Sequence, residues 1–349
     1  MVIRAFLCTV GVVLLLAHAN TSSARDPVRG FLTSSFKLTS SELDRIDAGQ
    51  VVSRTLTSSD PRDVATLGAV RIRATPEFYV ERLTDIEAFK RSDAVLQIGT
   101  FGNPPGADDL ADLKLDDWDV RKLRECRVGD CGVRLSAGGI ERFQKEVDWH
   151  RADAQSQANR LMRQVLSEYV TNYRNVGMAG AMKYADQAEP LESGPEFASL
   201  IDQDVDAWRH FTGLRQHLLQ FPSLSTPETI DILYWSKERA SRRTVVTVTH
   251  LAISRPAGGP SDYAIASKQI YGTHYFDASL GLTVLLRDRS ASPPAMYVLY
   301  LNRSRVDVFN GMFAGVARRI VSARTRSLVA EELGRVQRST EQQFAAASH

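Results

Sequence analysis

The segment Val70-Arg-Ile-Arg-Ala-Thr-Pro-Glu-Phe-Tyr-Val-Glu-Arg-Leu-Thr-Asp-Ile-Glu87 changes from the rhythm of a strand to that of a helix. A β-rich run over residues 64–73 ends inside it. Thr75 then offers an N-cap side chain, and Pro76 stands at the first helical position, where its missing N–H costs nothing. The segment therefore predicts a strand followed at once by a short helix.

The segments around it extend this alternation of strands and helices. A short helix is expected at 40–47, and strands at 50–57 and 94–101. Between residues 226 and 302 the period of two returns, with turn residues that suit an antiparallel meander. The strands predicted there are 230–238, 244–254, 263–277, 280–287 and 296–302.

Helical spacing dominates the rest of the chain. The residues from 104 to 222 predict a long amphipathic helix at 150–174 and further helices at 195–202 and 207–220. After Asn302 an apolar stripe runs from Phe313 to Val336. This stripe predicts one C-terminal helix long enough to cross a whole sheet.

The composition is that of an ordinary globular protein. The 349 residues carry 43 Lys+Arg against 41 Asp+Glu, with 43% hydrophobic and 24% charged residues. These values exclude a disordered chain, a collagen-like fibre and a disulfide-dense miniprotein. The formal net charge of +2 is nearly neutral and argues against a polybasic nucleic-acid binder.

The N-terminus has the pattern of an export signal. A positive start, Met1 to Arg4, precedes an apolar run that ends in the small-x-small motif Ala17-His18-Ala19. The apolar run, about 13 residues, is short for a bilayer core of roughly 30 Å. We interpret residues 1–19 as a signal peptide, with an uncleaved anchor as the alternative, and expect a periplasmic or secreted bacterial protein.

Two cysteines remain after such a signal. Cys126 and Cys131 lie close together in CRVGDC, and in an oxidising compartment a close pair predicts a disulfide. The spacing is not C-x-x-C and no histidine lies nearby, which disfavours a redox or metal site. The acidic residues between Asp108 and Asp119 lack the calcium-loop pattern, so no metal site is predicted.

The order of predicted elements resembles that of the START-like, or helix-grip, superfamily. The resemblance rests on residues 70–87 and on Tyr297-Val-Leu-Tyr-Leu-Asn302 with the helix over 309–337. It implies an α+β fold in which a curved antiparallel sheet grips a long C-terminal helix. Residues 20–349 would form one domain with its core at about 50–103 and 226–340, interrupted by a helical insertion at 104–222.

The resemblance also implies a cavity between sheet and helix that holds an apolar small molecule, such as a lipid or sterol. The ligand-pocket candidates are Tyr234, Trp235, Tyr271, His274, Tyr275, Phe309, Met312 and Phe313. Strict alternation places Tyr271 and Gln269 on one face of strand 263–277 and His274 on the other, without indicating which face is inside. No cofactor and no nucleic acid are expected, and transient contact with a membrane remains open.

Catalysis and protein binding are the alternatives. The motifs G-x-S-x-G, H-E-x-x-H and G-x-G-x-x-G and the P-loop are absent from the sequence. His274 or His250 with Asp277 is the acid–base pair that a cavity hydrolase or cyclase could use. His210 and His217 would share one helix face, and we interpret them as structural for want of a third ligand nearby. A third hypothesis is an envelope interaction protein whose cavity is filled by side chains.

Overall fold

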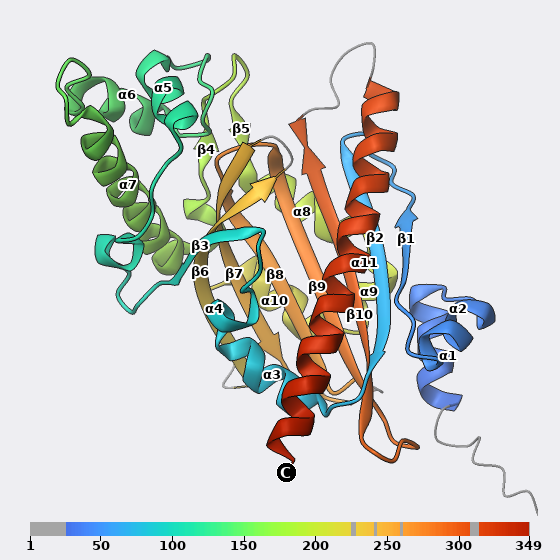
Figure 1. Cartoon of the computed structure of the whole chain (residues 1–349). Helices are drawn as coiled ribbons and strands as arrows, with labels where there is room; N and C mark the ends of the chain where they lie inside the picture. The colour runs from blue at the N-terminus through green and yellow to red at the C-terminus, as the bar shows by residue number, and fades with distance from the viewer. Residues whose placement is uncertain (1–25, 225–227, 241–242, 259–260, 308–313, 349) are drawn as a thin grey trace, which may run out of the picture.

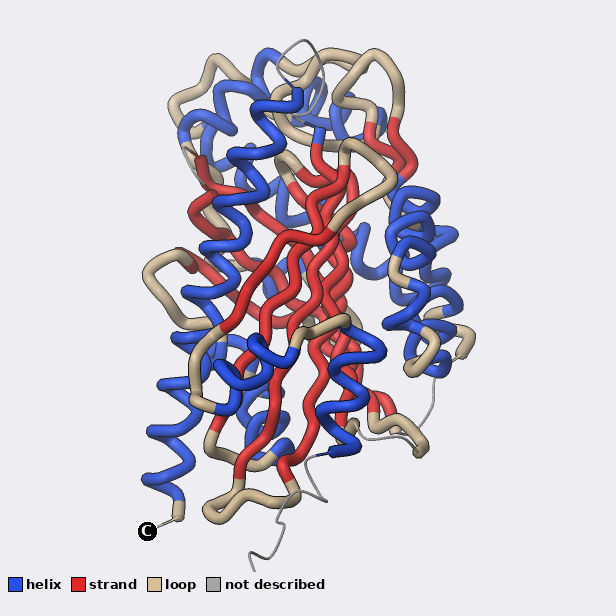
Figure 2. Tube along the Cα trace, turned by 90° about the vertical axis from the view of Figure 1, so that its right-hand side faces the viewer, coloured by secondary structure: helices blue, strands red, loops and turns tan. Residues whose placement is uncertain are grey.

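The computed structural model describes residues 26–224, 228–240, 243–258, 261–307 and 314–348. It is an α+β structure with a large, curved, unclosed sheet of eight antiparallel strands, as the sequence predicted (Figures 1 and 2). The strand order is β1–β2–β10–β9–β8–β7–β6–β3. The strands are β1 (Val52–Leu56), β2 (Asp63–Ile72), β3 (Val95–Thr100), β6 (Thr229–Ala240), β7 (Arg243–Ser254), β8 (Tyr263–Gly272), β9 (Phe276–Asp288) and β10 (Ala295–Val306).

Helices cover both faces of this sheet. Near the N-terminus are α1 (Asp26–Phe36), α2 (Ser40–Asp47), α3 (Pro76–Thr84) and α4 (Ile86–Phe89). Between β3 and β6 lie η2 (Ala107–Leu110), α5 (Asp117–Glu125), α6 (Ala137–Glu146), α7 (Ala154–Val176), η3 (Gly177–Gly180), the short strands β4 (Lys183–Tyr184) and β5 (Leu191–Glu192), α8 (Ser193–Gln203), α9 (Val205–Trp208) and α10 (Thr212–Gln220). The chain closes with α11 (Ala314–Ala347).

The junction between β2 and α3 forms as the sequence predicted. The Thr75 side chain accepts a hydrogen bond from the backbone N–H of Phe78, and Pro76 is the first helical residue. The cap satisfies one of the N–H groups that the first helical turn leaves without a partner. This junction turns the chain from the sheet into helices that cover one of its faces.

The long helix α11 lies along the edge strands of the sheet. Val329 and Leu333 pack on Gly68 of β2, where an added Cβ would lie 2.5 Å from Leu333 Cδ1. The other face of the sheet is covered by α1, α2 and α8 to α10, whose side chains share a core with Leu67, Leu282 and Leu301. In Figure 1 α11 accordingly crosses in front of the sheet, with α8 and α10 behind it.

The strands β3 and β6 pair with each other, and Gly99 lies opposite Trp235. The chain between them, which forms the helices, therefore leaves the sheet and returns to it at the same place. A disulfide joins Cys126 and Cys131 in this region, which confirms the predicted pair. Within the described ranges, no helix is both long and apolar enough to span a bilayer.

Two predicted elements differ in the structure. The strand expected at 263–277 is two strands, because the chain turns between Gly272 and Phe276 with Tyr275 at a left-handed φ of 69°. The helix expected at 207–220 is also divided, into α9 and α10, and His210 lies between them. The signal segment 1–19 and the pocket candidates Phe309, Met312 and Phe313 lie outside the described residues.

Candidate functional site

Trp235 and Tyr271, two of the predicted pocket residues, lie on the sheet face opposite to α11. Both are buried beneath the helices α5 to α7. Trp235 Nε1 donates to the Asp109 carbonyl at 2.7 Å, and the Tyr271 hydroxyl donates to the Arg134 carbonyl at 3.0 Å. These contacts join the helical region to the sheet.

A β-bulge explains why simple alternation misplaced Tyr271. Gln269 pairs with Thr249, whereas Tyr271 pairs with Val248, so Ile270 is an extra residue in β8. A bulge of one residue reverses the faces of the side chains beyond it. Gln269 and Tyr271 therefore lie on opposite faces, and the prediction that they share one was wrong.

The expected acid–base pair is not formed. His274 Nε2 lies 2.8 Å from Asp119 Oδ1 at the start of α5, and both side chains are buried. Asp277 instead accepts a hydrogen bond from Arg134 at 2.6 Å. Asp119 and Arg134, the actual partners of His274 and Asp277, both lie more than 100 residues away in sequence, so local spacing could not reveal them.

Tyr234, another of the predicted pocket residues, lies on the α11 side of the sheet. It packs in one cluster with α3, α4 and the second half of α11, and Lys90 Nζ lies 5.5 Å from the centroid of its ring. Lys90 also forms an ion pair with Glu238 at 2.8 Å. Tyr234 is thus held between hydrophobic packing and a charged pair.

Next to Tyr234, the same sheet face carries a polar band. Pairing across the strands places hydroxyl and amide side chains together there: Thr66, Thr247, Thr249, Ser267, Gln269, Ser279, Asn302 and Ser304. Ser279 and Ser304 hydrogen-bond to each other at 2.8 Å. A molecule on this part of the sheet would meet hydroxyl groups instead of the apolar wall that the resemblance implied.

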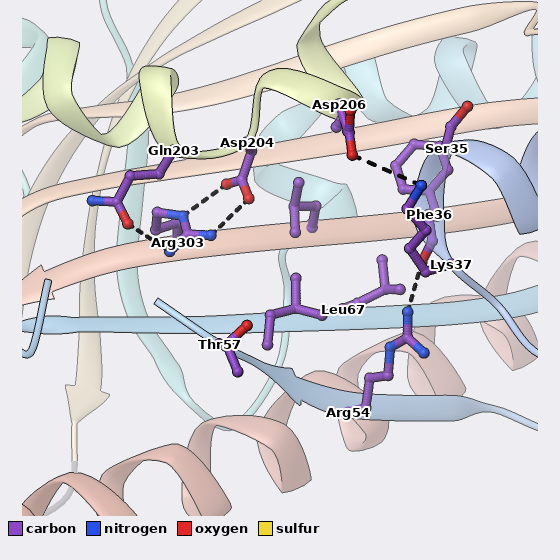
Figure 3. A pocket seen from close by; sticks show the side chains of 13 residues that line it. Ser35, Phe36, Lys37, Arg54, Thr57, Leu67, Gln203, Asp204, Asp206 and Arg303 are labelled. Atoms are coloured by element: carbon purple, nitrogen blue, oxygen red, sulfur yellow. Dashed lines mark hydrogen bonds and ion pairs between the residues drawn. The ribbon is translucent and has the colours of Figure 1, made fainter. Parts of the chain in front are cut away.

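A groove of about 500 Å³ opens on the other face, between the end of α1, strand β1 and the α8–α9 junction (Figure 3). Its volume lies within the usual range for small-molecule sites. We call it the α1–α9 groove. It is lined by Ser35, Phe36, Lys37, Arg54, Leu56, Thr57, Leu67, Gln203, Asp204, Asp206, Ala207, Leu301 and Arg303.

The lining of the α1–α9 groove is amphipathic. Leu67 and Leu301 from the sheet are buried apolar residues, while three cationic and two acidic side chains also contribute. Arg303 is committed to Asp204, which accepts two of its N–H groups at 2.6 and 2.8 Å. The Lys37 ammonium group donates to the Ser34 carbonyl at 2.7 Å and lies 3.8 Å from Asp206. Both charged side chains are exposed, so this pair is weak and the ammonium group can still donate to a ligand.

Arg54 is the second cation of the groove that can donate hydrogen bonds to a ligand. Its side chain donates to the Phe36 carbonyl at 2.6 Å and pairs with Glu42 at 3.3 Å. Its Nε is buried and has no hydrogen-bond partner among the described residues. The Arg54 side chain as a whole is 28% exposed and lines the groove, so N–H groups of its terminal nitrogens can also donate to an acidic ligand.

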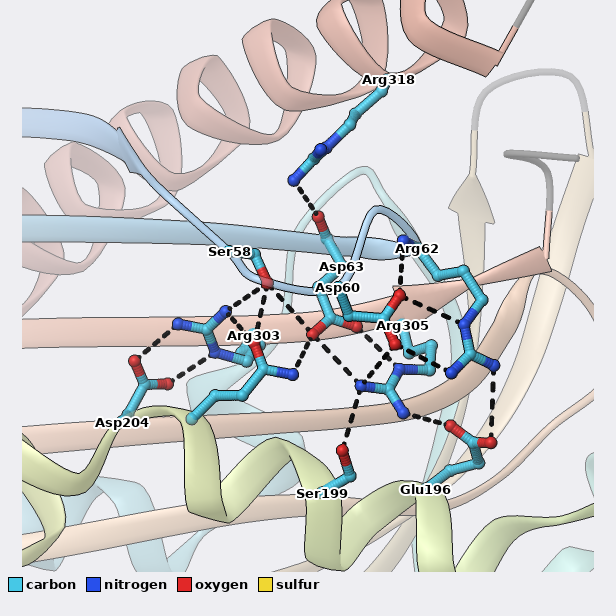
Figure 4. A network of polar contacts seen from close by, with 11 residues as sticks. Ser58, Asp60, Arg62, Asp63, Glu196, Ser199, Asp204, Arg303, Arg305 and Arg318 are labelled. Atoms are coloured by element: carbon cyan, nitrogen blue, oxygen red, sulfur yellow. Dashed lines mark hydrogen bonds and ion pairs between the residues drawn. The ribbon is translucent and has the colours of Figure 1, made fainter. Parts of the chain in front are cut away.

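A network of ion pairs supports one end of this groove (Figure 4). Arg305 donates to Asp63 at 2.7 Å and also pairs with Glu196 of α8. Its neighbour Arg303 donates to Ser58 at 3.0 Å. Because β10 and α8 are joined by these charges, the wall of the groove is held in place by the sheet.

A second cluster joins His217 of α10, Asp231 of β6 and His250 of β7. Asp231 Oδ1 lies 2.7 Å from Nε2 of each histidine. Burial opposes the charged form of Asp231, but its contacts with the two imidazoles lower its pKa to about 2. Burial also lowers the pKa of His250, whereas for His217 the carboxylate outweighs burial and the pKa is raised.

The sequence singled out His217 and His250 separately but did not connect them. His210, expected on the same helix face as His217, instead contacts Ser35 at 2.8 Å. The third ligand that the sequence analysis did not find is Asp231, which comes from a strand.

No protein-family model, curated protein or solved structure matches this chain.

Proposed function

We propose that the protein binds or carries an amphipathic small molecule, with the ligand in the α1–α9 groove. The observation that carries this proposal is the combination of a leucine-lined floor with two cations that have capacity to spare, Lys37 and Arg54. An apolar chain or ring system would cover Leu67 and Leu301, and an acidic head group would pair with the cations.

The START-like relationship is part of this proposal. What supports it is the element order: a strand, two short helices, a strand, five antiparallel strands and a long helix. In the sheet, β2, the first strand of this series along the chain, pairs with β10, the last one. In that relationship the helices between β3 and β6 are an insertion, and they supply one wall of the groove.

We further propose that the protein acts outside the cytoplasm. The predicted signal segment supports export, and the Cys126–Cys131 disulfide is of the kind that persists in oxidising compartments. A binding protein in the periplasm or outside the cell would hold its ligand away from water during transit.

Binding of an anionic amphipathic probe tests the proposal. We would titrate the purified chain with 1-anilinonaphthalene-8-sulfonate and displace the dye with dodecanoate. Thr57→Trp should fill the groove and weaken both probes by more than about tenfold. Lys37→Gln should weaken dodecanoate and leave an uncharged alcohol of the same length unaffected.

Thr55→Trp is the matched control. Thr55 lies exposed on β1, two residues before Thr57, which follows the end of that strand; Thr55 pairs with Thr66 of the polar band and does not line the groove. It should bind both probes like the wild type. Equal effects of Thr55→Trp and Thr57→Trp, or no binding by the wild-type chain, would remove the groove as the ligand site.

A further inference from the structure

In the cluster of His217, Asp231 and His250, the hydrogen bonds at Nδ1 fix the direction in which each Nε2 points. His217 Nδ1 lies 2.6 Å from the carbonyl oxygen of Leu224. A carbonyl oxygen has no proton to give, so Nδ1 must be the donor. In a neutral imidazole the lone pair of Nε2 then points at Asp231 Oδ1, 2.7 Å away. Two acceptors at this distance require a cation between them, which is either the proton of a charged imidazolium or a metal ion.

His250 is arranged in a similar way. Its Nδ1 lies 2.8 Å from the Tyr173 hydroxyl, which can accept the ring proton, and its Nε2 lies 2.7 Å from the same Asp231 oxygen. Each imidazole thus has an oxygen partner at Nδ1 and directs Nε2 into the cluster. Metal-binding histidines characteristically use such a contact to set their tautomer and orientation.

The surroundings hold both rings in place while leaving one side open. Phe221 packs against His250, with ring centroids 4.5 Å apart, and against Tyr173 and His217 at 5.4 and 5.7 Å. Both histidines are buried, yet the side chain of Asp231 is 24% exposed. An ion can therefore reach the cluster from the carboxylate side, where water can complete its coordination.

We propose that His217, Asp231 and His250 form a binding site for a divalent transition-metal ion, with zinc the best chemical match. The three ligand atoms lie within 4.8 Å of one another. Two imidazole nitrogens, one carboxylate oxygen and one water make a donor set that suits tetrahedral zinc at about 2.0–2.2 Å from each ligand. Binding requires the exposed carboxylate to move outward by a few tenths of an ångström, since zinc ligands lie farther apart than hydrogen-bonded atoms.

The ion would connect α10 to strands β6 and β7. The buried ammonium group of Lys268 acts electrostatically on His250, but it donates its hydrogen bond to the Leu218 carbonyl at 3.1 Å. His217, Asp231 and His250 are absent from the lining of the α1–α9 groove, so the proposed metal site does not depend on the function proposed for the groove.

Metal titration of the full chain tests the proposal. After treatment with a chelator, the protein should bind one Zn²⁺ per chain in calorimetry, and Co²⁺ should give the intense visible absorption of a four-coordinate ion. His217→Ala and Asp231→Asn should each weaken Zn²⁺ binding by more than about 100-fold. Tyr173→Phe keeps the ring packing and should weaken it by roughly tenfold.

His210→Ala is the matched control, because His210 belongs to the same helical region but bonds to Ser35. It should bind Zn²⁺ like the wild type. If a variant folds poorly, the midpoint of thermal unfolding remains informative: Zn²⁺ should raise it for the wild type and leave Asp231→Asn unchanged. Absence of Zn²⁺ binding by the wild type, or equal losses in His210→Ala and His217→Ala, would overturn the proposal and leave a proton as the cation of the cluster.

Discussion

Arg305 on β10 and Asp63 on β2 face each other across the sheet as a buried ion pair. The strand register makes them direct partners, and Arg305 Nε donates to Asp63 Oδ1 at 2.7 Å. Their side chains are 2% and 0% exposed. Removing charges from water to this extent is tolerated only when each charge finds partners, and Asp60 and Glu196 provide further contacts to Arg305.

Arg305→Met should therefore be strongly destabilising. The substitution leaves Asp63 buried without its cation, and we expect a loss of about 3–5 kcal/mol in the free energy of unfolding measured with urea. Arg62→Met is the comparison, because Arg62 belongs to the same network but is 38% exposed. It should cost less than about 1 kcal/mol. Similar losses for both variants would show that burial does not govern this network.

Gly177 should tolerate no side chain. It has a left-handed φ of 59°, and a Cβ atom there would lie 1.6 Å from the Phe221 carbonyl oxygen. Gly177→Ala must move the segment that holds Phe221 against His250, so we expect a loss of more than about 3 kcal/mol.

Gly213 in α10 provides the opposite case. A Cβ atom at Gly213 would meet nothing within 4 Å. Gly213→Ala should raise stability by about 0.5–1 kcal/mol, because alanine loses less backbone entropy than glycine in a helix. Thermal unfolding followed by circular dichroism would detect both shifts, and equal signs for the two variants would contradict the structure.

The ion pair between Lys90 and Glu238 should make the free energy of unfolding fall in acid, where Glu238 becomes protonated. Burial by itself would raise the pKa of Glu238, but the charge and hydrogen bond of Lys90 lower it. A carboxyl group whose pKa is lower in the folded state than in the unfolded state stabilises the protein at pH values above its unfolded pKa, which is near 4 to 5. This stabilisation is lost as the pH falls below that value. The wild type should therefore lose stability more steeply in acid than Glu238→Gln.

The same variant should be destabilised by about 2 kcal/mol at neutral pH, since Lys90 loses its partner. Urea denaturation at a series of pH values measures both effects. Glu125→Gln, at an exposed ion pair with Lys122, should leave the acid profile unchanged. A parallel acid profile for wild type and Glu238→Gln would show that the pair does not couple to folding.

The disulfide should contribute modestly. Cys126 and Cys131 are five residues apart, and so short a loop restricts the unfolded chain by only about 2 kcal/mol. Replacing both cysteines with alanine should lower stability by that amount in non-reducing buffer. In strong reductant the wild type should approach the variant, and a persistent difference would point to packing of the thiols instead.

Several elements could be predicted because their signals are local. The cap formed by Thr75 and Pro76 depends on neighbouring backbone groups, and α3 begins where these residues placed it. The long helix and most strands follow from apolar periodicity, which a few consecutive residues express. The Cys126–Cys131 pair likewise needs only short-range geometry.

The apolar stripe of α11 shows where periodicity stops being informative. Val329, Leu333 and Val336 are buried on the sheet, as expected of such a stripe. Val316 and Ile320 of the same stripe are 58% and 65% exposed, whereas their neighbours Ala317 and Val321 pack against the sheet. Spacing identifies a helix face but not the surface that covers it.

The sequence by itself determined most strands and helices and the disulfide, because each depends on residues close together in the chain, and the order of these elements indicated the fold class. Only the tertiary structure decided which side chains meet. The extra residue Ile270 reverses the face of Tyr271, and His217, Asp231 and His250 converge from a helix and two strands. The α1–α9 groove likewise combines side chains from α1, from β1 and β2, from the α8–α9 junction and from β10. Such contacts depend on strand register and on helix packing over long separations, which one-dimensional spacing does not contain.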